Sequence, residues 1–401
     1  MNSASIALND CSSARPSHAR IVGVGESALG KVPDLSPLQL QQVAAQAALD
    51  DAGLDWSDID GLLTTPIRAA QWAMPCGVVA EGLGIRSPRY LATLDVAGAS
   101  GTAMIHQAAM AIEAGQCDTV LCVAGQNLLT YSARADAVRQ MAEGGWAHPQ
   151  FEAPFGPLIA SLYALVAQRH MHEYGTTAEQ LAEVAVTMRA HAALNPLAQK
   201  RTPITVSDVL GSRMITSPLH VLDCALVSDG AAAIVVTRAD RARDTRNRSV
   251  RLLGQGYGFS HAYIGHYESL TRTGAVDSGR TAFSMAGLRP SEIDIAQLYD
   301  CFTITVIVEL EDLGFCGKGE GGAFVQGGRI GLAGKLPVTT HGGLLSACHP
   351  GLAGGMFHVI EAVRQLRGQC GGRQVPDAQI ALVHGNGGVI GIHCTLIMAA
   401  E

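Results

Sequence analysis

Short apolar runs alternate with longer alanine-rich segments through the first third of the chain. The runs have the length of buried strands, whereas the longer segments repeat their apolar residues with the spacing of a helix. We therefore expect strands near 20–24, 58–63, 90–95 and 119–125, and helices near 38–51, 72–83 and 102–114. Strands that alternate with helices predict an α/β architecture, with a mostly parallel sheet and helices on its faces.

This alternation stops in the segment 126–219, which opens irregularly around Trp146 and Pro149. Two helices are expected within it, near 159–174 and 178–195, and a strand near 231–236 then resumes the earlier pattern. We interpret 126–219 as an insertion that forms a lid over the substrate, because long irregular segments in compact domains commonly carry binding functions.

A segment of the first half recurs in the second. Ala52-Gly-Leu-x-x-Ser57-Asp-Ile-Asp60 reappears as Ala286-Gly-Leu-x-x-Ser291-Glu-Ile-Asp294. The turn at Gly98, with the helix and strand that follow it, likewise has a counterpart in the stretch 341–384. Such a repeat predicts two similar α/β halves related by a pseudo-dyad, whose glycine-rich turns meet near the axis at the carboxyl ends of strands.

The domain organisation follows from these patterns. We expect a flexible N-terminus over 1–19, a first half over 20–255 that includes the insertion, and a second half over 256–401. The densest run of charge, 238–249, is interpreted as a solvated linker between the halves, with phosphate binding as the weaker alternative.

Composition narrows the functional classes. The chain has 401 residues, of which 48% are hydrophobic and 16% charged, as is typical of a compact globular protein. A net charge of -7 without a basic cluster argues against nucleic-acid binding. The ten cysteines form no CxxC pair, which favours free thiols in a reducing compartment over disulfides or a metal site. Without a signal peptide or a membrane-spanning apolar run, we expect a cytoplasmic protein.

Four segments combine glycine with side chains capable of chemistry: Gly98–Gly101, Gln297–Phe302, His341–Gly355 and Val383–Gly388. Three follow predicted strands and one leads into a helix, so we expect them to converge on one cleft. His349 precedes the predicted helix 356–366, whose free N–H groups favour negative charge, and histidine exchanges protons near neutral pH. The alternative for this loop is a packed glycine-rich turn with a surface histidine.

Together these motifs resemble the thiolase superfamily, specifically its sterol carrier protein-type branch. The resemblance covers about residues 20–400 and is carried by 222–235, by Tyr299-Asp-Cys-Phe302, by His341-Gly-Gly-Leu-Leu-Ser-x-x-His349-Pro-Gly and by His384-Gly-Asn-Gly-Gly388. It implies a thiolase fold in which two duplicated halves form a five-layered α/β/α/β/α sandwich. It also implies homodimers, an acyl-CoA substrate, and no cofactor apart from the coenzyme A carried by that substrate.

The departures from this family are informative. Thiolases carry a nucleophilic cysteine where this chain has Gly98, and many use a second cysteine at a position that corresponds to about Gly385. Glycine cannot form a thioester, so covalent acyl transfer at these positions is excluded. Cys301 and Cys348 lie within the site motifs but away from the nucleophile's turn, and Cys224 matches a structural cysteine of the branch.

A thiolase-like chain without the nucleophile resembles the aldolases of steroid side-chain breakdown, which cleave a 3-hydroxyacyl-CoA by a retro-aldol reaction. Tyr299 fills a site position of the family, and we expect it to exchange a proton with the 3-hydroxyl, as a base only if its pKa is lowered. His349 would bind the thioester oxygen or reprotonate the enolate. Backbone N–H groups near Gly98 and Gly388 would stabilise the oxyanion. The alternative for Tyr299 is that its hydroxyl only anchors the strand end.

His341, His384 and Asp300 are expected in supporting positions, and the two histidines are interpreted as ordering loops. The aldolases that the chain resembles work with a small zinc-ribbon and OB-like partner protein, so the resemblance implies a hetero-oligomer. Two other hypotheses remain open. The first is an acyltransferase with a displaced nucleophile at Cys301 or Cys348, and the second is a non-catalytic subunit that binds acyl-CoA or lipid.

Overall fold

The computed structural model describes residues 18–67, 70, 72–131, 145 and 147–401. Most of the expected flexible N-terminus (residues 1–17) and Trp146 therefore lie outside the described residues. None of the helices in these ranges is both long enough and apolar enough to cross a membrane.

The first half follows the predicted alternation of strands and helices. Its elements are β1 (Ala19–Glu26), α1 (Pro37–Ala52), β2 (Gly61–Thr64), α2 (Pro75–Leu83), β3 (Tyr90–Thr93), α3 (Ser100–Glu113) and β4 (Thr119–Asn127). A capping box between Ser36 and Gln39 fixes the start of α1, and Gly53 ends it with a φ of 71°. The predicted elements are thus confirmed, with boundaries shifted by a few residues.

The insertion contains α4 (Leu128–Tyr131), α6 (Ile159–Tyr174), α7 (Ala178–Ala193), α8 (Val206–Leu210) and a small hairpin of β5 (Met214–Thr216) and β6 (Leu219–His220). The two helices predicted here are confirmed as α6 and α7. Strand β7 (Asp229–Arg238) then returns to the main sheet. Apolar residues of α6 and α7 pack against α10 in the second half, so the insertion covers the second half.

The second half consists of β8 (Val250–Phe259), α9 (Ala275–Ala286), β9 (Ile295–Gln297), α10 (Thr303–Asp312), α11 (Gly321–Phe324), α12 (Gly354–Leu366), β10 (Ile380–Gly387) and β11 (Ile392–Ala400). Strand β8 crosses the expected boundary between residues 255 and 256. The second half therefore begins with β8 at Val250, a few residues before the expected boundary.

All the long strands form one nine-stranded sheet in the order β3-β2-β4-β7-β1-β8-β11-β10-β9. The halves join where β1 pairs antiparallel with β8. Outward from this pair the order is β7, β4, β2, β3 on one side and β11, β10, β9 on the other, and a parallel bridge between Ala296 and Val338 takes the place that β3 has in the first half. The repeated order supports the predicted duplication.

The expectation of a mostly parallel sheet is wrong. Only the β2–β3, β2–β4 and β9–β10 pairs are parallel, whereas β7 and β11 run antiparallel to both of their neighbours. A tight turn links β10 to β11, and such a turn can only join antiparallel strands. In the first half the insertion replaces that turn between β4 and β7.

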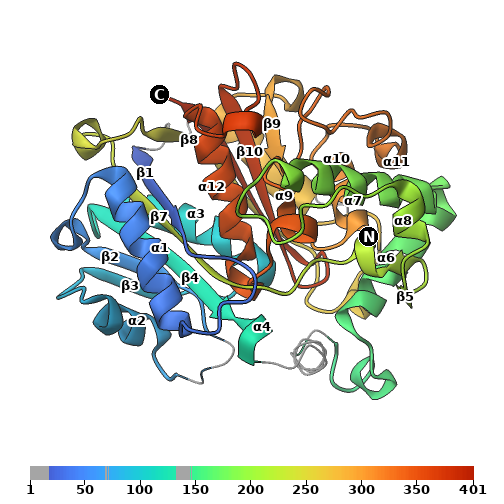
Figure 1. Cartoon of the computed structure of the whole chain (residues 1–401), viewed down its shortest axis with the longest axis horizontal. Coiled ribbons are helices and arrows are strands. Elements are labelled where there is room, and N and C mark those ends of the chain that lie inside the picture. Colours follow the sequence, from blue (N-terminus) through green and yellow to red (C-terminus); the bar gives the residue numbers. More distant parts are fainter. Residues whose placement is uncertain (1–17, 68–69, 71, 132–144, 146) are drawn as a thin grey trace, which may run out of the picture.

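Most of the apolar core forms three large clusters, and the largest surrounds α3 and α12, which lie between the strands of the two halves (Figure 1). Side chains alternate along the strands, so that Leu121 of β4 faces α1 and α2, whereas Val120 and Cys122 face α3 and α12. The outer face of the second half packs against α9 and α10. The predicted thiolase fold is confirmed, with α3 and α12 lying together in the middle.

Candidate active site

The N-termini of α3 and α12 meet between the two halves. A Cβ atom on Gly101 would lie 2.5 Å from the backbone nitrogen of Met356, and one on Gly355 would lie 2.9 Å from the carbonyl oxygen of Gly98. Only glycine permits an approach this close. The predicted meeting of the Gly98 turn with the His349 loop is therefore confirmed, and it explains the glycines at both helix starts.

Tyr299 and His349 form a hydrogen-bonded pair beside this contact. The phenol Oη lies 3.3 Å from His349 Nε2, and the rings are nearly perpendicular. His349 Nδ1 lies 3.2 Å from the carbonyl oxygen of Leu226, which can only accept a hydrogen bond. The proton of the neutral imidazole is therefore on Nδ1, so Nε2 accepts the hydrogen bond that Tyr299 donates.

Tyr299 also fills the space next to Gly98. A Cβ atom on Gly98 would overlap with Cζ and Oη of Tyr299 and with the carbonyl oxygen of Asn386. The phenol thus lies where a side chain at residue 98 would project. The same holds for Gly385, where a Cβ atom would overlap with the hydroxyl of Thr102. The two positions at which the family comparison predicts cysteines have no room for one here.

Burial changes the pKa of both side chains in the Tyr299–His349 pair. It raises the pKa of Tyr299 well above the usual value, with smaller contributions from Cys301 and Asp300. The lowered pKa that would let Tyr299 act as a base is therefore not found. Burial lowers the pKa of His349 to about 4, so this imidazole is neutral at pH 7 and able to accept a proton.

Asp300 supports the loop rather than facing the Tyr299–His349 pair. Its carboxylate accepts hydrogen bonds from the backbone nitrogens of Leu344 and Leu345, at 2.8 and 3.2 Å. It also pairs with His358 Nε2 at 3.3 Å, and the ring of His358 stacks on that of Tyr299. Asp300 thus fixes the backbone of the His349 loop at Leu344 and Leu345, and its supporting role in catalysis stays a prediction.

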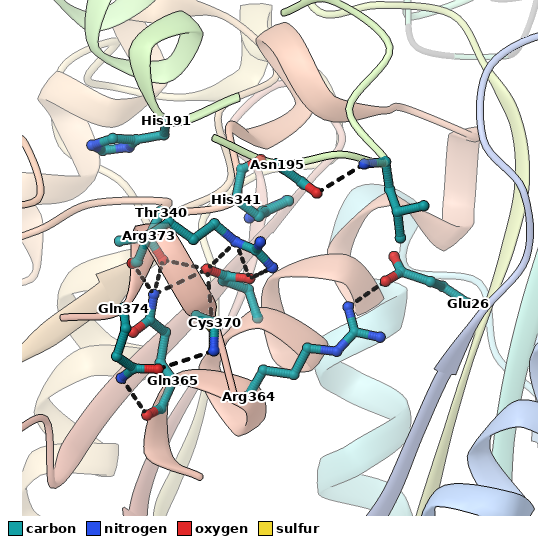
Figure 2. Close-up of polar contacts among 12 residues, drawn as sticks. Glu26, His191, Asn195, Thr340, His341, Arg364, Gln365, Cys370, Arg373 and Gln374 are labelled. Carbon is teal, nitrogen blue, oxygen red and sulfur yellow. Dashed lines mark hydrogen bonds and ion pairs between the residues drawn. The ribbon is translucent and has the colours of Figure 1, made fainter. Parts of the chain in front are cut away.

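His341 lies away from the pair, in a small polar cavity (Figure 2). Its ring packs edge-on against His358, and its backbone oxygen accepts a hydrogen bond from Asn195. Two ion pairs line the cavity, Glu26 with Arg364 and Glu361 with Arg373. Burial lowers the pKa of His341 well below its usual value. Within the described residues neither ring nitrogen of His341 has a hydrogen-bond partner, and the interpretation that His341 orders the loop stays a prediction.

His384 also lies away from the pair. Its Nδ1 accepts a hydrogen bond from the Thr395 hydroxyl, and its Nε2 donates one to His393 Nδ1, both at 2.9 Å. His393 in turn donates from Nε2 to the carbonyl oxygen of Ile390 at 3.0 Å. His384 therefore orders the turn after Gly388 through His393, as a supporting residue would.

Gly388 lies in that turn with a φ of 69°, and a Cβ atom there would meet nothing within 4 Å. The space beside its backbone is open, which an oxyanion site requires. Among the described residues, no group of three or more His, Cys, Asp or Glu side chains is arranged to hold a metal ion.

The cysteines within the motifs are buried thiols. Burial raises the pKa of Cys301 and of Cys348, in each case with a contribution from nearby carboxylates. Cys224 is partly buried, and its Sγ lies 3.3 Å from the carbonyl oxygen of His220. A raised pKa removes the thiolate that a nucleophile needs, so Cys301 and Cys348 have the properties of packing residues.

Two residues near the pair were missed from the sequence. Glu309 of α10 is 1% exposed, and its Oε2 accepts a hydrogen bond from the Tyr299 backbone nitrogen at 3.1 Å. Burial raises its pKa well above the usual value. Tyr163 of α6 stacks on Phe302 with ring centroids 4.4 Å apart. The one signal in the sequence that could have indicated Glu309 was the presence of a glutamate within the apolar run of α10.

Two duplicated halves with opposed glycine-rich turns, and a polar pair between them, define a thiolase-type protein. Comparison with known families agrees, because the profile "Thiolase, N-terminal domain" matches residues 19–218 and "Thiolase C-terminal domain-like" matches residues 256–400. The chain belongs to the thiolase superfamily.

Its relatives carry different activities. A "Steroid side-chain-cleaving aldolase" of Thermomonospora curvata is 38% identical over 364 residues, covering 88% of this chain and 91% of the relative. An "Acetyl-CoA acetyltransferase" of Methanothermobacter thermautotrophicus is 34% identical over 380 residues, covering 93% and 98%. The solved structure "Ltp2-ChsH2(DUF35) aldolase" superposes with a TM-score of 0.84 at 35% identity, covering 95% of this chain and 97% of that one.

Proposed function

We propose that the protein is a carbon–carbon lyase that cleaves a 3-hydroxyacyl-CoA by a retro-aldol reaction. The observation that carries this proposal is that Tyr299 occupies the space next to Gly98, where a thiolase nucleophile would project. Without a side chain at residue 98, the turn cannot take up an acyl group. A retro-aldol reaction needs only proton transfer and stabilisation of an enolate, and the Tyr299–His349 pair supplies the first of these.

In the proposed reaction, Tyr299 passes its proton to His349 Nε2 as it takes the proton of the substrate's 3-hydroxyl. The developing alkoxide becomes a carbonyl while the Cα–Cβ bond breaks, and the bonding electrons move into the thioester enolate. The enolate Cα then regains the proton from the imidazolium, which restores both residues. N–H groups near Gly98 and Gly388 would stabilise the negative enolate oxygen.

The relatives support a bulky acyl group and a partner protein. Two similar proteins, one of known sequence and one of known structure, are named as aldolases, the first acting on a steroid side chain and the second paired with a ChsH2(DUF35) protein. We infer a steroid side chain or another bulky acyl-CoA as substrate, and a small partner protein of that type. A homodimer is also proposed, because β3 ends the sheet with a partly exposed Leu91.

The test is an assay of a panel of 3-hydroxyacyl-CoAs with the protein and its small partner co-expressed. We expect a ketone or aldehyde and a shortened acyl-CoA in equal amounts, without added free CoA. A requirement for free CoA in stoichiometric amounts would contradict the proposal, because thiolytic cleavage consumes CoA and retro-aldol cleavage does not.

A second candidate is an acyltransferase, favoured by the similar acetyl-CoA acetyltransferase. It would need Cys301 or Cys348 as nucleophile, and the raised pKa of both thiols argues against this role. A CoA-dependent burst of product or a trapped acyl-cysteine would select it. Binding of acyl-CoA without turnover in any reconstituted complex would instead select a non-catalytic subunit.

A further inference from the structure

The turn that joins β10 to β11 has all four of its carbonyl groups held by hydrogen bonds from outside it. Tyr163 Oη donates to the oxygen of Gly388 at 2.9 Å, and His261 Nε2 donates to that of Val389 at 2.8 Å. His393 donates to the oxygen of Ile390, and the backbone nitrogen of Ser260 to that of Gly391. The direction of each peptide plane in the turn is therefore fixed.

The N–H groups of the same turn are in a different situation. The amide of Gly391 donates to the oxygen of Gly387 and that of Ile390 donates to the Tyr163 hydroxyl oxygen, but within the described ranges those of Gly388 and Val389 donate to no protein group. Buried amides are seldom left in this state. Gly388 and Ile390 have φ values of 69° and 51°, and such a conformation is costly for a β-branched residue and typical of functional sites.

Successive free N–H groups in such a turn form a concavity that binds anions. The turn 388–391 lies beside the Tyr299–His349 pair, because the carbonyl oxygen of Asn386, two residues before Gly388, packs against Gly98. The anion that the proposed reaction generates is the thioester enolate. The enolate oxygen is therefore the anion that the turn would bind.

Tyr163 connects the insertion to this turn. It lies on α6, it is 1% exposed, and its ring stacks on Phe302 at an interplanar angle of 27°. Because the C=O of Gly388 and the N–H of Val389 belong to one planar peptide group, a donor that holds this carbonyl also fixes the direction of the Val389 N–H. Without the Tyr163 hydroxyl, the Gly388 carbonyl would be free to rotate into the space that the free N–H groups face.

We propose that Tyr163 is a positioning residue, which holds the turn 388–391 so that its free N–H groups receive the thioester oxygen as it becomes negative. The inference rests on the proposed function, and it adds a role for the insertion in the chemistry itself. Removal of the hydroxyl should weaken binding of an anion at this position more than binding of a neutral group.

The test compares two stable ligands in the wild-type complex and in Tyr163→Phe, which keeps the ring and removes only the hydroxyl. S-Carboxymethyl-CoA places a carboxylate where the enolate would form, whereas S-ethyl-CoA is neutral. We expect wild type to prefer the carboxylate ligand, and the preference to fall about 10-fold in Tyr163→Phe, since one lost oxyanion donor costs about 10²–10³ and here a donor is only displaced. Affinity for S-ethyl-CoA should stay unchanged.

Tyr174→Phe is the matched control, because Tyr174 lies on the same helix but is partly exposed. It should leave both affinities at wild-type values. In turnover assays Tyr163→Phe should lower kcat about 10-fold with KM retained. An unchanged preference in Tyr163→Phe, or no preference in wild type, would overturn the inference. Wild type that prefers the carboxylate ligand yet cleaves no substrate would contradict the proposed function alone.

Discussion

The Gly98 turn and the His349 loop occupy equivalent places in the two halves, yet they contribute differently. Each leads into a helix of the middle layer, and glycines at 98, 101 and 355 let the two helix starts touch. The first turn offers only backbone at residue 98, whereas the second carries an imidazole. The duplication has therefore kept the backbone frame on both sides, while the phenol and the imidazole of the candidate site come from the second half.

Tyr299 adds a second difference between the two halves. It belongs to the second half, but its phenol occupies the volume that a side chain of the first-half turn would need. In the proposed function, occupancy of this one volume favours proton transfer over covalent chemistry. Substitutions at this volume and around it therefore test the difference between the two halves.

Replacing Tyr299 by Phe should have the largest effect. The ring would still fill the space beside Gly98, but the proton path from substrate to His349 would be lost, so the rate should fall by about 10²–10⁴. Steady-state kinetics with a cleaved 3-hydroxyacyl-CoA measures this. Tyr257→Phe, at a partly exposed position on β8, is the control and should be neutral. Undiminished turnover in Tyr299→Phe would remove this residue from the mechanism.

Replacing His349 by Gln should lower the rate by about 10²–10³, because an amide cannot accept the proton. In wild type the base works in its neutral form, which exists above its pKa. Since that pKa is lowered to about 4, kcat/KM should stay level down through pH 6.5 and decline only on approach to pH 4. A decline centred near pH 6.5 would show that the histidine is more solvated than the structure indicates.

Gly98→Ala should disturb both stability and activity. The added methyl group would overlap with the phenol, and overpacking of this kind costs about 1–3 kcal/mol of unfolding free energy. Displacement of Tyr299 should also lower the rate by roughly 10-fold to 100-fold. Gly77→Ala in α2 is the control, because its nearest atom would be 3.7 Å away. Chemical denaturation and kinetics that find both variants alike would contradict the occupancy of this space by Tyr299.

Replacing Cys301 or Cys348 by Ala should have the smallest effect on catalysis. Both thiols are buried with raised pKa values, so neither variant should change kcat by more than about 3-fold, although loss of packing should lower the free energy of unfolding by about 1 kcal/mol. Thermal unfolding alongside kinetics separates the two effects. Complete inactivation of a variant that still folds would support the hypothesis of an acyltransferase with a displaced nucleophile.

The sequence predicted local structure well and electrostatics poorly. Periodicity located α6, α7 and α12, because each buries one apolar face over several turns. The direction of β7 could not be predicted from the sequence, because it depends on the path by which the insertion leads the chain back to the sheet. The motifs indicated Tyr299 and His349, and the structure places them in contact. The raised pKa of Tyr299 was missed because it results from burial by segments distant in the sequence.

The measurement that tests the central claim most directly is the mass of the intact protein during a single turnover of a 3-hydroxyacyl-CoA. If the proposed retro-aldol reaction is correct, the carbonyl product and the shortened acyl-CoA appear while the protein keeps its unmodified mass. An acyl adduct that forms and decays at the rate of turnover would contradict it and would assign the protein a covalent, thiolase-like mechanism.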